Sequence, residues 1–316
     1  MSDRDDEMYR AAVLYYVQGE SMDAIARQLG VSRSTVSRSL KQARDTGIVR
    51  ISLTHPRDAS SDVEQEFTER FGVRAQVVSV RESVSDVARL DRVAKVAANA
   101  IGEAVDDHTV LGIAWGTTID AVAAHLLAKP VRGCTLVQLN GAANDSTTGI
   151  DYVSNIASRF ASAFNAHSVL FPVPAFFDYA STRDAMWRER SIMRVRDTQK
   201  KCSLAVFGVG SLVGGLPSHV YESGYFDEED RAQMARDRVV GDVCTVLLRQ
   251  NGSWADIEMN TRASGLTPTQ LRRIPRRIGV VAGRAKAKPL LAALRAQLMT
   301  DLIVDDQTAR HVLTMT

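Results

Sequence analysis

The chain has 316 residues, of which 45% are hydrophobic and 24% charged, and its formal net charge is +2. This composition is ordinary for a soluble globular protein, and the length suits one small module and one domain of about 250 residues. The nearly balanced charge excludes a uniformly basic chain, so any contact with nucleic acid must be local.

The stretch from Ser21 to Leu53 predicts a winged helix-turn-helix, and a helix over residues 7–17 precedes it to complete a three-helix core. The first helix of the motif begins after the N-cap Ser21 and ends at Gly30, which accepts the left-handed backbone of a turn. Ser32 caps the second helix, which begins at the next residue.

The second helix has the side chains of a DNA-recognition helix. Val36, Leu40 and Ala43 share its inner face, which leaves hydroxyl and guanidinium groups for the outer face and the first turn. In the major groove, arginine pairs with guanine edges and hydroxyls reach bases or phosphates. Residues 49–53 then alternate as a wing strand should. The candidate DNA contacts are Ser32, Arg33, Ser34, Thr35, Ser37, Arg38 and Arg50.

The local charge agrees with this interpretation. Residues 24–50 contain six Lys or Arg residues and one Asp, an excess of five in a chain whose net charge is +2. A solvated basic face on an ordinary three-helix subdomain is the alternative. Because the apolar spacing, the caps, the glycine turn and the wing agree, we favour DNA binding.

A polar segment around Pro56 predicts a domain boundary. We expect a DNA-binding domain over residues 1–55, a linker over residues 56–61 and an effector-binding domain over residues 62–316. The second domain opens with an amphipathic helix over residues 62–71 that can pack on its own domain or on a partner chain.

From residue 74 onward, apolar strand-like runs alternate with amphipathic helical stretches. The predicted strands are AQVVSV, TVLGIAW, TLVQLNG, HSVLFPV, SLAVFGVG, DVCTVLL, RIGVVAG and DLIVDD. The predicted helices cover residues 87–105, 120–128, 153–165, 228–237, 289–298 and 307–313. This alternation is typical of a mostly parallel sheet covered on both faces, so we predict a Rossmann-like α/β domain. Ligands of such sheets bind beyond the carboxyl ends of the strands.

Two strand ends offer polar groups for a small ligand. The strand TVLGIAW is followed by a glycine, two threonines and a helix that starts near Ile119 or Asp120, which can form a small cradle for a phosphate or a sugar hydroxyl. TLVQLNG ends in carboxamides suited to sugar hydroxyls. The alternative for each of these two segments is an ordinary tight turn without a ligand. The candidate contacts are Gly116, Thr117, Thr118, Gln138, Asn140 and Gly141.

Three later strand ends are less specific. The glycine-rich run that starts at Gly208 lacks the full dinucleotide fingerprint and a clear following helix, so nucleotide binding is disfavoured there. Asp242, before a predicted strand, is either a turn residue or part of the site. Gly283, Arg284 and Lys286 lie between a strand and a helix, where they either contact an anion or form a solvated helix start.

The sequence contains no signal for a metal, a disulfide or a membrane span. Cys134, Cys202 and Cys244 lie far apart in apolar stretches, which favours buried thiols in a reducing compartment. The six histidines have no metal-binding spacing. The first residues are too acidic for a signal peptide, and no apolar run approaches the roughly 20 residues of a membrane span. We expect a cytoplasmic protein without metal or cofactor.

In order and spacing, these segments resemble the SorC-type bacterial sugar-responsive transcriptional regulators, which are grouped with the deoxyribonucleoside regulators and the central glycolytic gene regulator. The resemblance covers essentially the whole chain and is carried by VSRSTVSRSLKQARDTGIVRISL, LGIAWGTTI, VQLNG, FGVGS, VVGDVC, NTR, VVAG and LIVDDQTA. It implies an effector domain related to glucosamine-phosphate deaminase and ribose-phosphate isomerase folds, a free or phosphorylated sugar as ligand, and oligomers, commonly tetramers, on operator DNA.

The resemblance also implies roles for single residues. It implies a phosphate loop at residues 116–118, sugar contacts at residues 138, 140 and 141, and a pocket acid at Asp242. Where the family reads AGGxxK, this chain has Arg284 at the second glycine and a lysine displaced by one position. Both a phosphorylated and an unphosphorylated effector therefore stay open.

We predict a sequence-specific DNA-binding transcriptional regulator of carbohydrate metabolism, controlled by a sugar, polyol or sugar-phosphate effector. The first alternative is an active sugar-phosphate isomerase or deaminase with a DNA-binding module, because fold does not settle function. The chain offers no well-placed acid and base pair, so we expect no enzyme. The second alternative is an architectural DNA-binding protein, which the polar strand ends argue against. A homo-oligomer is expected, because one helix-turn-helix buries too little surface to select a genomic site.

Overall fold

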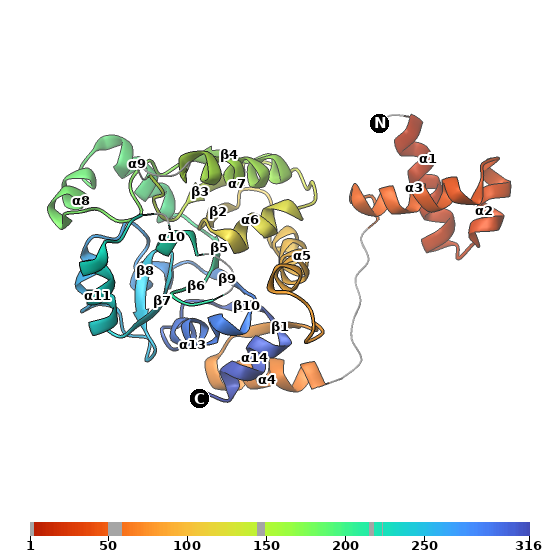
Figure 1. The fold of residues 1–316 in the computed structure, drawn as a ribbon. Helices are drawn as coiled ribbons and strands as arrows, with labels where there is room; N and C mark the ends of the chain where they lie inside the picture. The colour runs from red at the N-terminus through yellow and green to blue at the C-terminus, as the bar shows by residue number, and fades with distance from the viewer. Residues whose placement is uncertain (1–2, 50–58, 144–148, 215–217, 223) are drawn as a thin grey trace. The chain divides into compact units, whose positions relative to one another are not determined.

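The computed structural model describes residues 3–49, 59–143, 149–214, 218–222 and 224–316 (Figure 1). The chain divides into two compact units, Met1–Pro56 and Arg57–Thr316. No helix in the described ranges is long and apolar enough to cross a membrane.

The first unit is a small helical bundle. Helix α1 (Asp3–Ala12) continues into a π-helical turn (Val13–Val17), and α2 (Met22–Leu29) and α3 (Arg33–Asp45) follow. The side chains buried among them are Met8, Ala11, Ala12, Leu14, Ile25, Val36, Leu40 and Ala43. The helix predicted from residue 7 therefore begins four residues earlier. Of the predicted wing strand, residues 50–53, including the candidate contact Arg50, lie outside the described residues.

The junction between α2 and α3 has the predicted turn geometry. The Oγ of Ser21 accepts the N–H of Ala24 at 3.2 Å, and the Oγ of Ser32 accepts the N–H of Thr35 at 3.1 Å. Gly30 ends α2 with a φ of 67°, in the left-handed region that glycine adopts without a steric cost. The two hydroxyls satisfy amides that have no partner inside a helix.

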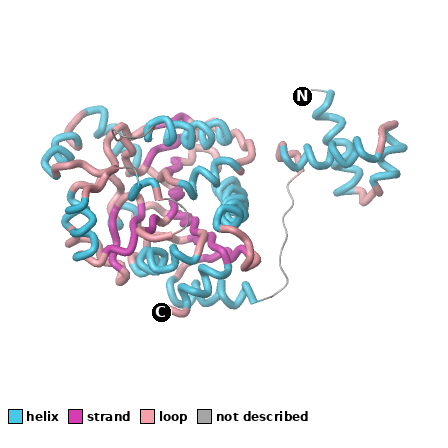
Figure 2. Tube along the Cα trace, in the orientation of Figure 1, coloured by secondary structure: helices cyan, strands magenta, loops and turns pink. Residues whose placement is uncertain are grey.

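The second unit is built on a seven-stranded parallel sheet with the order β1-β10-β9-β5-β2-β3-β4 (Figures 1 and 2). These strands are β1 (Arg74–Val78), β2 (Val110–Ile113), β3 (Thr135–Gln138), β4 (His167–Val169), β5 (Leu204–Gly208), β9 (Arg276–Val281) and β10 (Asp301–Asp305). From β2 the chain adds strands in one direction, and from β5 in the other. Because β2 and β5 are neighbours, the strand order reverses between them, which is where open parallel sheets bind ligands.

Helices cover both faces of this sheet. Helices α5 (Asp86–Ala104), α6 (Thr117–Ala124) and α7 (Gly149–Phe164) pack on one face, and α4 (Ala59–Phe71), α9 (Arg190–Gln199), α13 (Ala287–Arg295) and α14 (Asp306–Leu313) on the other. The strands are apolar on both sides because both faces are buried. Helix α4 begins three residues before the predicted start, so residues 59–61 of the predicted linker are helical.

A small antiparallel sheet, β6-β7-β8, lies beside the large one. Its strands are β6 (Gly210–Ser211), β7 (Val239–Val243) and β8 (Val246–Arg249). The single predicted strand DVCTVLL is wrong, because it folds as part of a hairpin with a two-residue turn at Cys244 and Thr245. Their φ values are 50° and 66°. Tight hairpins require this left-handed backbone, but they usually signal it with glycine or asparagine.

The remaining elements in the described residues are short helices and two 3₁₀ turns. They are α8 (Ala180–Met186), α10 (His219–Glu222), α11 (Glu228–Arg236), α12 (Pro268–Leu271) and the 3₁₀ turns Glu258–Thr261 and Arg284–Lys286. Side chains of α10, α11, the turn Glu258–Thr261, the small sheet and adjacent loops form a separate apolar cluster that includes Phe176, Phe226, Leu247 and Ile257.

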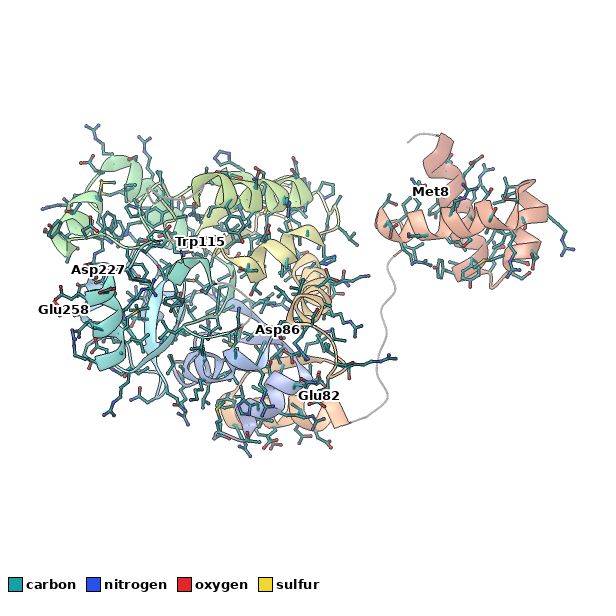
Figure 3. All side chains as sticks on the ribbon, in the orientation of Figure 1. Met8, Glu82, Asp86, Trp115, Asp227 and Glu258 are labelled. Carbon is teal, nitrogen blue, oxygen red and sulfur yellow. The ribbon has the colours of Figure 1, made fainter. Side chains whose placement is uncertain are left out.

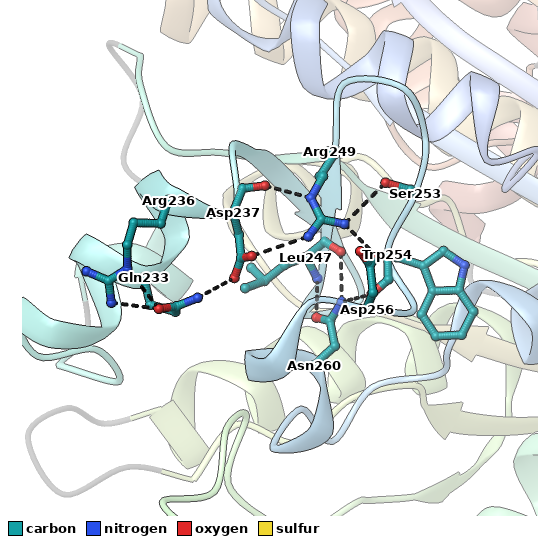
Figure 4. Close-up of polar contacts among 9 residues, drawn as sticks. All are labelled: Gln233, Arg236, Asp237, Leu247, Arg249, Ser253, Trp254, Asp256 and Asn260. Carbon is teal, nitrogen blue, oxygen red and sulfur yellow. Dashed lines mark hydrogen bonds and ion pairs between the residues drawn. The ribbon is translucent and has the colours of Figure 1, made fainter.

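Two polar side chains fix strand β8 in place (Figure 4). Asn260 pairs with both backbone groups of Leu247, accepting its N–H at 2.8 Å and donating to its carbonyl at 3.0 Å, as a neighbouring strand would. Arg249 donates to the carboxylates of Asp237 and Asp256 at 3.3 and 2.6 Å. These contacts satisfy the outer edge of the small sheet and hold the hairpin that reaches the functional site.

Candidate functional site

A cavity with a volume of about 510 Å³ opens at the carboxyl ends of β2 and β5, where the strand order reverses. The turn between β2 and α6 forms one wall, the segment after β5 another, and the β7–β8 hairpin a third. Six of the ten predicted effector contacts line this cavity: Gly116, Thr117, Thr118, Asn140, Asp242 and Lys286.

The turn between β2 and α6 presents the start of a helix to the cavity. Gly116 precedes α6 with a φ of 142°, a conformation that residues with a Cβ rarely adopt. Helix α6 begins at Thr117, two to three residues earlier than predicted, so both threonines lie in its first turn. The first backbone amides of a helix lack internal partners and favour an anion.

Lys286 supplies a positive charge at this helix start. Its Nζ donates to the Oγ1 of Thr118 at 3.2 Å from a half-buried position. Burial lowers the pKa of its ammonium to about 8, although the nearby carboxylate of Asp242 opposes the shift. Among the described residues, no carboxylate forms an ion pair with this ammonium. The cavity therefore contains a partly desolvated cation beside a helix N-terminus.

Asp242 faces the cavity from the small sheet. It lies inside strand β7, so the interpretation as a turn residue before a strand is wrong. Its side chain is buried and accepts hydrogen bonds from the hydroxyl of Tyr221 and the N–H of Thr245, each at 2.9 Å. Burial raises the pKa of the Asp242 carboxyl, and these two hydrogen bonds counteract the rise. A Cβ at Gly210, on the paired strand, would come within 1.9 Å of its Oδ1.

Asn140 lines the cavity and has an unused hydrogen-bond acceptor. Its side chain is 2% exposed, and its Oδ1 has no hydrogen-bond partner among the described residues. Leaving a buried polar group without a partner costs about 1–3 kcal/mol. A bound ligand hydroxyl that donates to this oxygen would remove that cost.

The other two residues predicted at the end of β3 do not line the cavity. Gln138 does not line the cavity, because its side-chain amide is used within the protein: it donates to the carbonyl of Asn140 at 2.7 Å and accepts the N–H of Phe171 at 3.0 Å. Gly141 donates its N–H to Ser264 at 2.9 Å and accepts from the indole of Trp115 at 2.8 Å. Both residues brace the loops around the site.

Gly283 and Arg284 also lie outside the cavity lining. The N–H of Gly283 donates to Asp305 at 2.9 Å, and the side chain of Arg284 is exposed. The 3₁₀ turn Arg284–Lys286 separates the two basic side chains by two residues, so only the lysine turns inward. The predicted anion contacts at Gly283 and Arg284 are therefore not supported by the geometry.

Several lining residues were absent from the sequence prediction. Trp115, labelled in Figure 3, lies two residues after the end of β2 and lines the cavity together with Thr245 of the hairpin turn. Gly208 and Gly210 belong to the glycine-rich run at which the sequence disfavoured nucleotide binding. A Cβ at Gly208 would stand 3.3 Å from the Cβ of Thr118, so this glycine allows β5 and α6 to approach. The sequence prediction missed Trp115 because it placed this residue inside the strand TVLGIAW, whereas β2 ends at Ile113.

The described ranges contain no group of three or more His, Cys, Asp and Glu side chains that could hold a metal ion. Cys244 lines the cavity, but burial raises the pKa of its thiol far above the usual value, which disfavours a reactive thiolate.

The outer face of α3 is polar and accessible. Arg33 and Arg38 are exposed at its start and one turn later, together with Ser34 and Ser37. The Nε of Arg33 lies 3.7 Å from a carboxylate oxygen of Asp23, but both side chains are more than 60% exposed, which makes the pair weak. The predicted contacts of α3 thus lie on one solvent-facing surface.

Comparison with known proteins gives matches for both units. Residues 55–314 match the Sugar-bind family, described as a sugar-binding domain, and residues 4–50 match HTH_23, described as a homeodomain-like domain. The deoxyribonucleoside regulator of Bacillus subtilis (strain 168) is 30% identical over 300 residues, which cover 95% of each chain.

Solved structures of regulators also match this chain. A domain of a possible sugar-binding transcriptional regulator from Arthrobacter aurescens TC1 is 46% identical, with a TM-score of 0.76, and the match covers 82% of this chain and 100% of that one. The full-length sorbitol operon regulator SorC from Klebsiella pneumoniae has a TM-score of 0.72 at 24% identity, covering 99% of this chain and 100% of that one. At 24% identity, the match to SorC shows a shared fold alone.

Proposed function

Because this chain belongs to the SorC-type family of sugar-binding transcriptional regulators, we propose that it binds operator DNA through α3 and that a sugar phosphate in the cavity controls this binding. The proposed DNA-binding domain is residues 1–55 and the proposed effector domain residues 62–316. The curated relatives at this similarity are named as regulators, and we propose that the cavity binds its ligand without turnover. The regulated genes would be those of carbohydrate metabolism.

The main support for a phosphorylated ligand is the position of the Lys286 ammonium in the cavity. A half-buried cation without a carboxylate partner among the described residues is costly, and a ligand anion would compensate it. The first turn of α6 adds amides and two threonine hydroxyls on the same side of the cavity. Asn140 and Asp242, which also line the cavity, supply acceptors for sugar hydroxyls.

The displaced lysine of the family motif does not remove the anion site. In this chain Lys286 reaches Thr118 from a 3₁₀ turn, while Arg284 remains in solvent. We propose that Lys286 performs the role of the family lysine and that Arg284 neither replaces it nor blocks a phosphate.

Replacing the threonines of the turn tests the site. Thr117→Val and Thr118→Val should each weaken the binding of a sugar phosphate by about tenfold or more, because a hydrogen bond to a charged group contributes roughly 1.5–3 kcal/mol. Isothermal titration against a panel of sugar phosphates, sugars and polyols measures the change, and DNA affinity without effector should stay the same. Unchanged affinity in both variants would place the ligand elsewhere, and turnover of any panel member would support the enzymatic alternative.

The affinity for a sugar phosphate should also fall between pH 8 and pH 9.5. Lys286 binds an anion as ammonium, and its pKa in the free protein is about 8, so the binding form is lost as the pH rises. A phosphate monoester has its second pKa near about 6 and keeps a constant charge in this range. The fall should approach tenfold per pH unit at most and should be absent for an unphosphorylated sugar, as measured by calorimetry at each pH.

We further propose a homo-oligomer, commonly a tetramer in this family, because paired half-sites need more than one helix-turn-helix. Light scattering at several protein concentrations, with and without DNA, measures the oligomeric state. Finding only monomers would contradict the proposal.

A further inference from the structure

A buried carboxylate lies behind the loop that carries Lys286. Asp305, at the end of β10, is 0% exposed, and its two oxygens accept four hydrogen bonds from three different segments. Its Oδ1 accepts from the guanidinium of Arg89 in α5 at 3.0 Å and from the N–H of Thr308 in α14 at 3.1 Å. Its Oδ2 accepts from the hydroxyl of Thr308 at 2.6 Å and from the N–H of Gly283 at 2.9 Å.

The bond to Gly283 fixes the start of the turn that leads to the cavity. Gly283 has a φ of 103°, and the N–H of Lys286 donates back to its carbonyl at 2.9 Å. The carbonyl of Ala285 accepts from the hydroxyl of Ser211 at 3.3 Å. The turn is thus held at Gly283 and at Ala285, and its last residue, Lys286, donates its Nζ to Thr118. Without the anchor at Gly283, a lysine side chain would gain hydration by leaving the cavity.

We propose that Asp305 is a positioning residue, which through its hydrogen bond to the N–H of Gly283 holds the turn so that the ammonium of Lys286 stays inside the cavity. This inference rests on the proposed anion site for its purpose, but the position of Lys286 can be measured without any ligand. Asp305 does not line the cavity and acts through the backbone of the turn.

The substitution Asp305→Asn separates this role from the capping of α14. An asparagine oxygen can still accept the N–H of Thr308, whereas its amide nitrogen would meet the N–H of Gly283, donor against donor. Removing the charge leaves Arg89 unpaired in the interior, so a second variant, Arg89→Met with Asp305→Asn, removes both charges. Gly283→Ala perturbs the same turn through its positive φ alone, because among the described residues a Cβ there would meet only Asp86, at 4.0 Å.

Trace labelling of amines with acetic anhydride, quantified by mass spectrometry across pH, reports the titration midpoint of Lys286. Asp242 and Thr118 are the polar groups facing this amine, and neither is altered in the variants. The wild-type midpoint should lie at about 8. In all three variants it should move toward the solvent value of about 10.4. Asp306→Asn is the matched control, because it neutralises the adjacent carboxylate, which accepts from Val80 instead, and its midpoint should equal that of the wild type.

The proposal is overturned if the titration midpoint of Lys286 stays at about 8 in a folded Arg89→Met, Asp305→Asn double variant. It is also overturned if Asp306→Asn shifts the midpoint as much as Asp305→Asn does. Circular dichroism melts identify variants that fail to fold, and the double variant is chosen so that a folded form remains. Inorganic phosphate added to the wild-type protein tests the anion site separately, since it should slow the labelling of Lys286. Absence of this protection, with the midpoint shifts intact, would refute the anion site and leave the positioning role standing.

Discussion

Replacing Lys286 by methionine should weaken the binding of a sugar phosphate by roughly 10- to 150-fold, because a hydrogen bond to a charged group contributes roughly 1.5–3 kcal/mol. Methionine keeps the length and the apolar stem, so the change isolates the ammonium that contacts Thr118. An unphosphorylated sugar should lose much less affinity. Calorimetry with each ligand and its phosphate measures the difference.

Lys288→Met is the matched control for this experiment. Lys288 lies two residues further along the same segment, carries the same charge and is exposed outside the cavity lining. Arg284→Gly serves as a second control, because its guanidinium is also in solvent. Equal losses in Lys286→Met and Lys288→Met would mean that the phosphate senses only the general charge of the surface. A phosphate preference that appears only in Arg284→Gly would mean that the wild-type regulator responds to an unphosphorylated effector.

Arg33→Ala and Arg38→Ala should each cost about 1–3 kcal/mol of operator affinity and relax the sequence preference at the base pair that the arginine contacts. Both guanidiniums project from the exposed face of α3, whose buried face is fixed by Val36, Leu40 and Ala43. The measurement is fluorescence anisotropy with a site selected in vitro by the purified protein, compared with scrambled DNA at the same salt concentration. Loss on the selected site alone indicates a base contact, and equal loss on both indicates a phosphate contact.

Arg10→Ala provides the comparison for these two variants. Arg10 is an exposed arginine of α1, outside the recognition helix, and the substitution removes the same charge from the same unit. Its effect on the selected site should be smaller than that of either α3 variant. If Arg33→Ala and Arg38→Ala bind the selected site as the wild type does, α3 is not the recognition helix.

The sequence by itself determined the elements whose signals are local. The caps Ser21 and Ser32, the left-handed Gly30 and the apolar face of α3 all act within a few residues, and the structure has each of them as predicted. Apolar strands alternating with amphipathic helices likewise determined the parallel sheet, because both of its faces must be buried. The same alternation predicted a ligand beyond the carboxyl ends of the strands, whereas the strand order that selects β2 and β5 came from the structure.

Only the tertiary structure decided which polar side chains enter the cavity. Gln138 and Asn140 lie at one strand end, yet the side chain of Gln138 bonds the backbone of Phe171, while Asn140 lines the cavity and its Oδ1 has no partner among the described residues. Arg284 and Lys286 are equally basic in sequence, and a 3₁₀ turn anchored by Asp305, 22 residues further along the chain, selects the lysine.

The place of Asp242 in the cavity was also decided by tertiary structure. Its place in the site depends on a hairpin whose turn, at Cys244 and Thr245, has a left-handed backbone in residues that rarely adopt it. Contacts from outside the hairpin stabilise this turn, since the backbone of Cys244 packs against Gly265, where a Cβ would clash at 1.6 Å. From local propensity, the segment DVCTVLL was predicted to be one apolar strand. The energies that decide side-chain direction at this site come from contacts between segments distant in sequence, which single-chain periodicity does not contain.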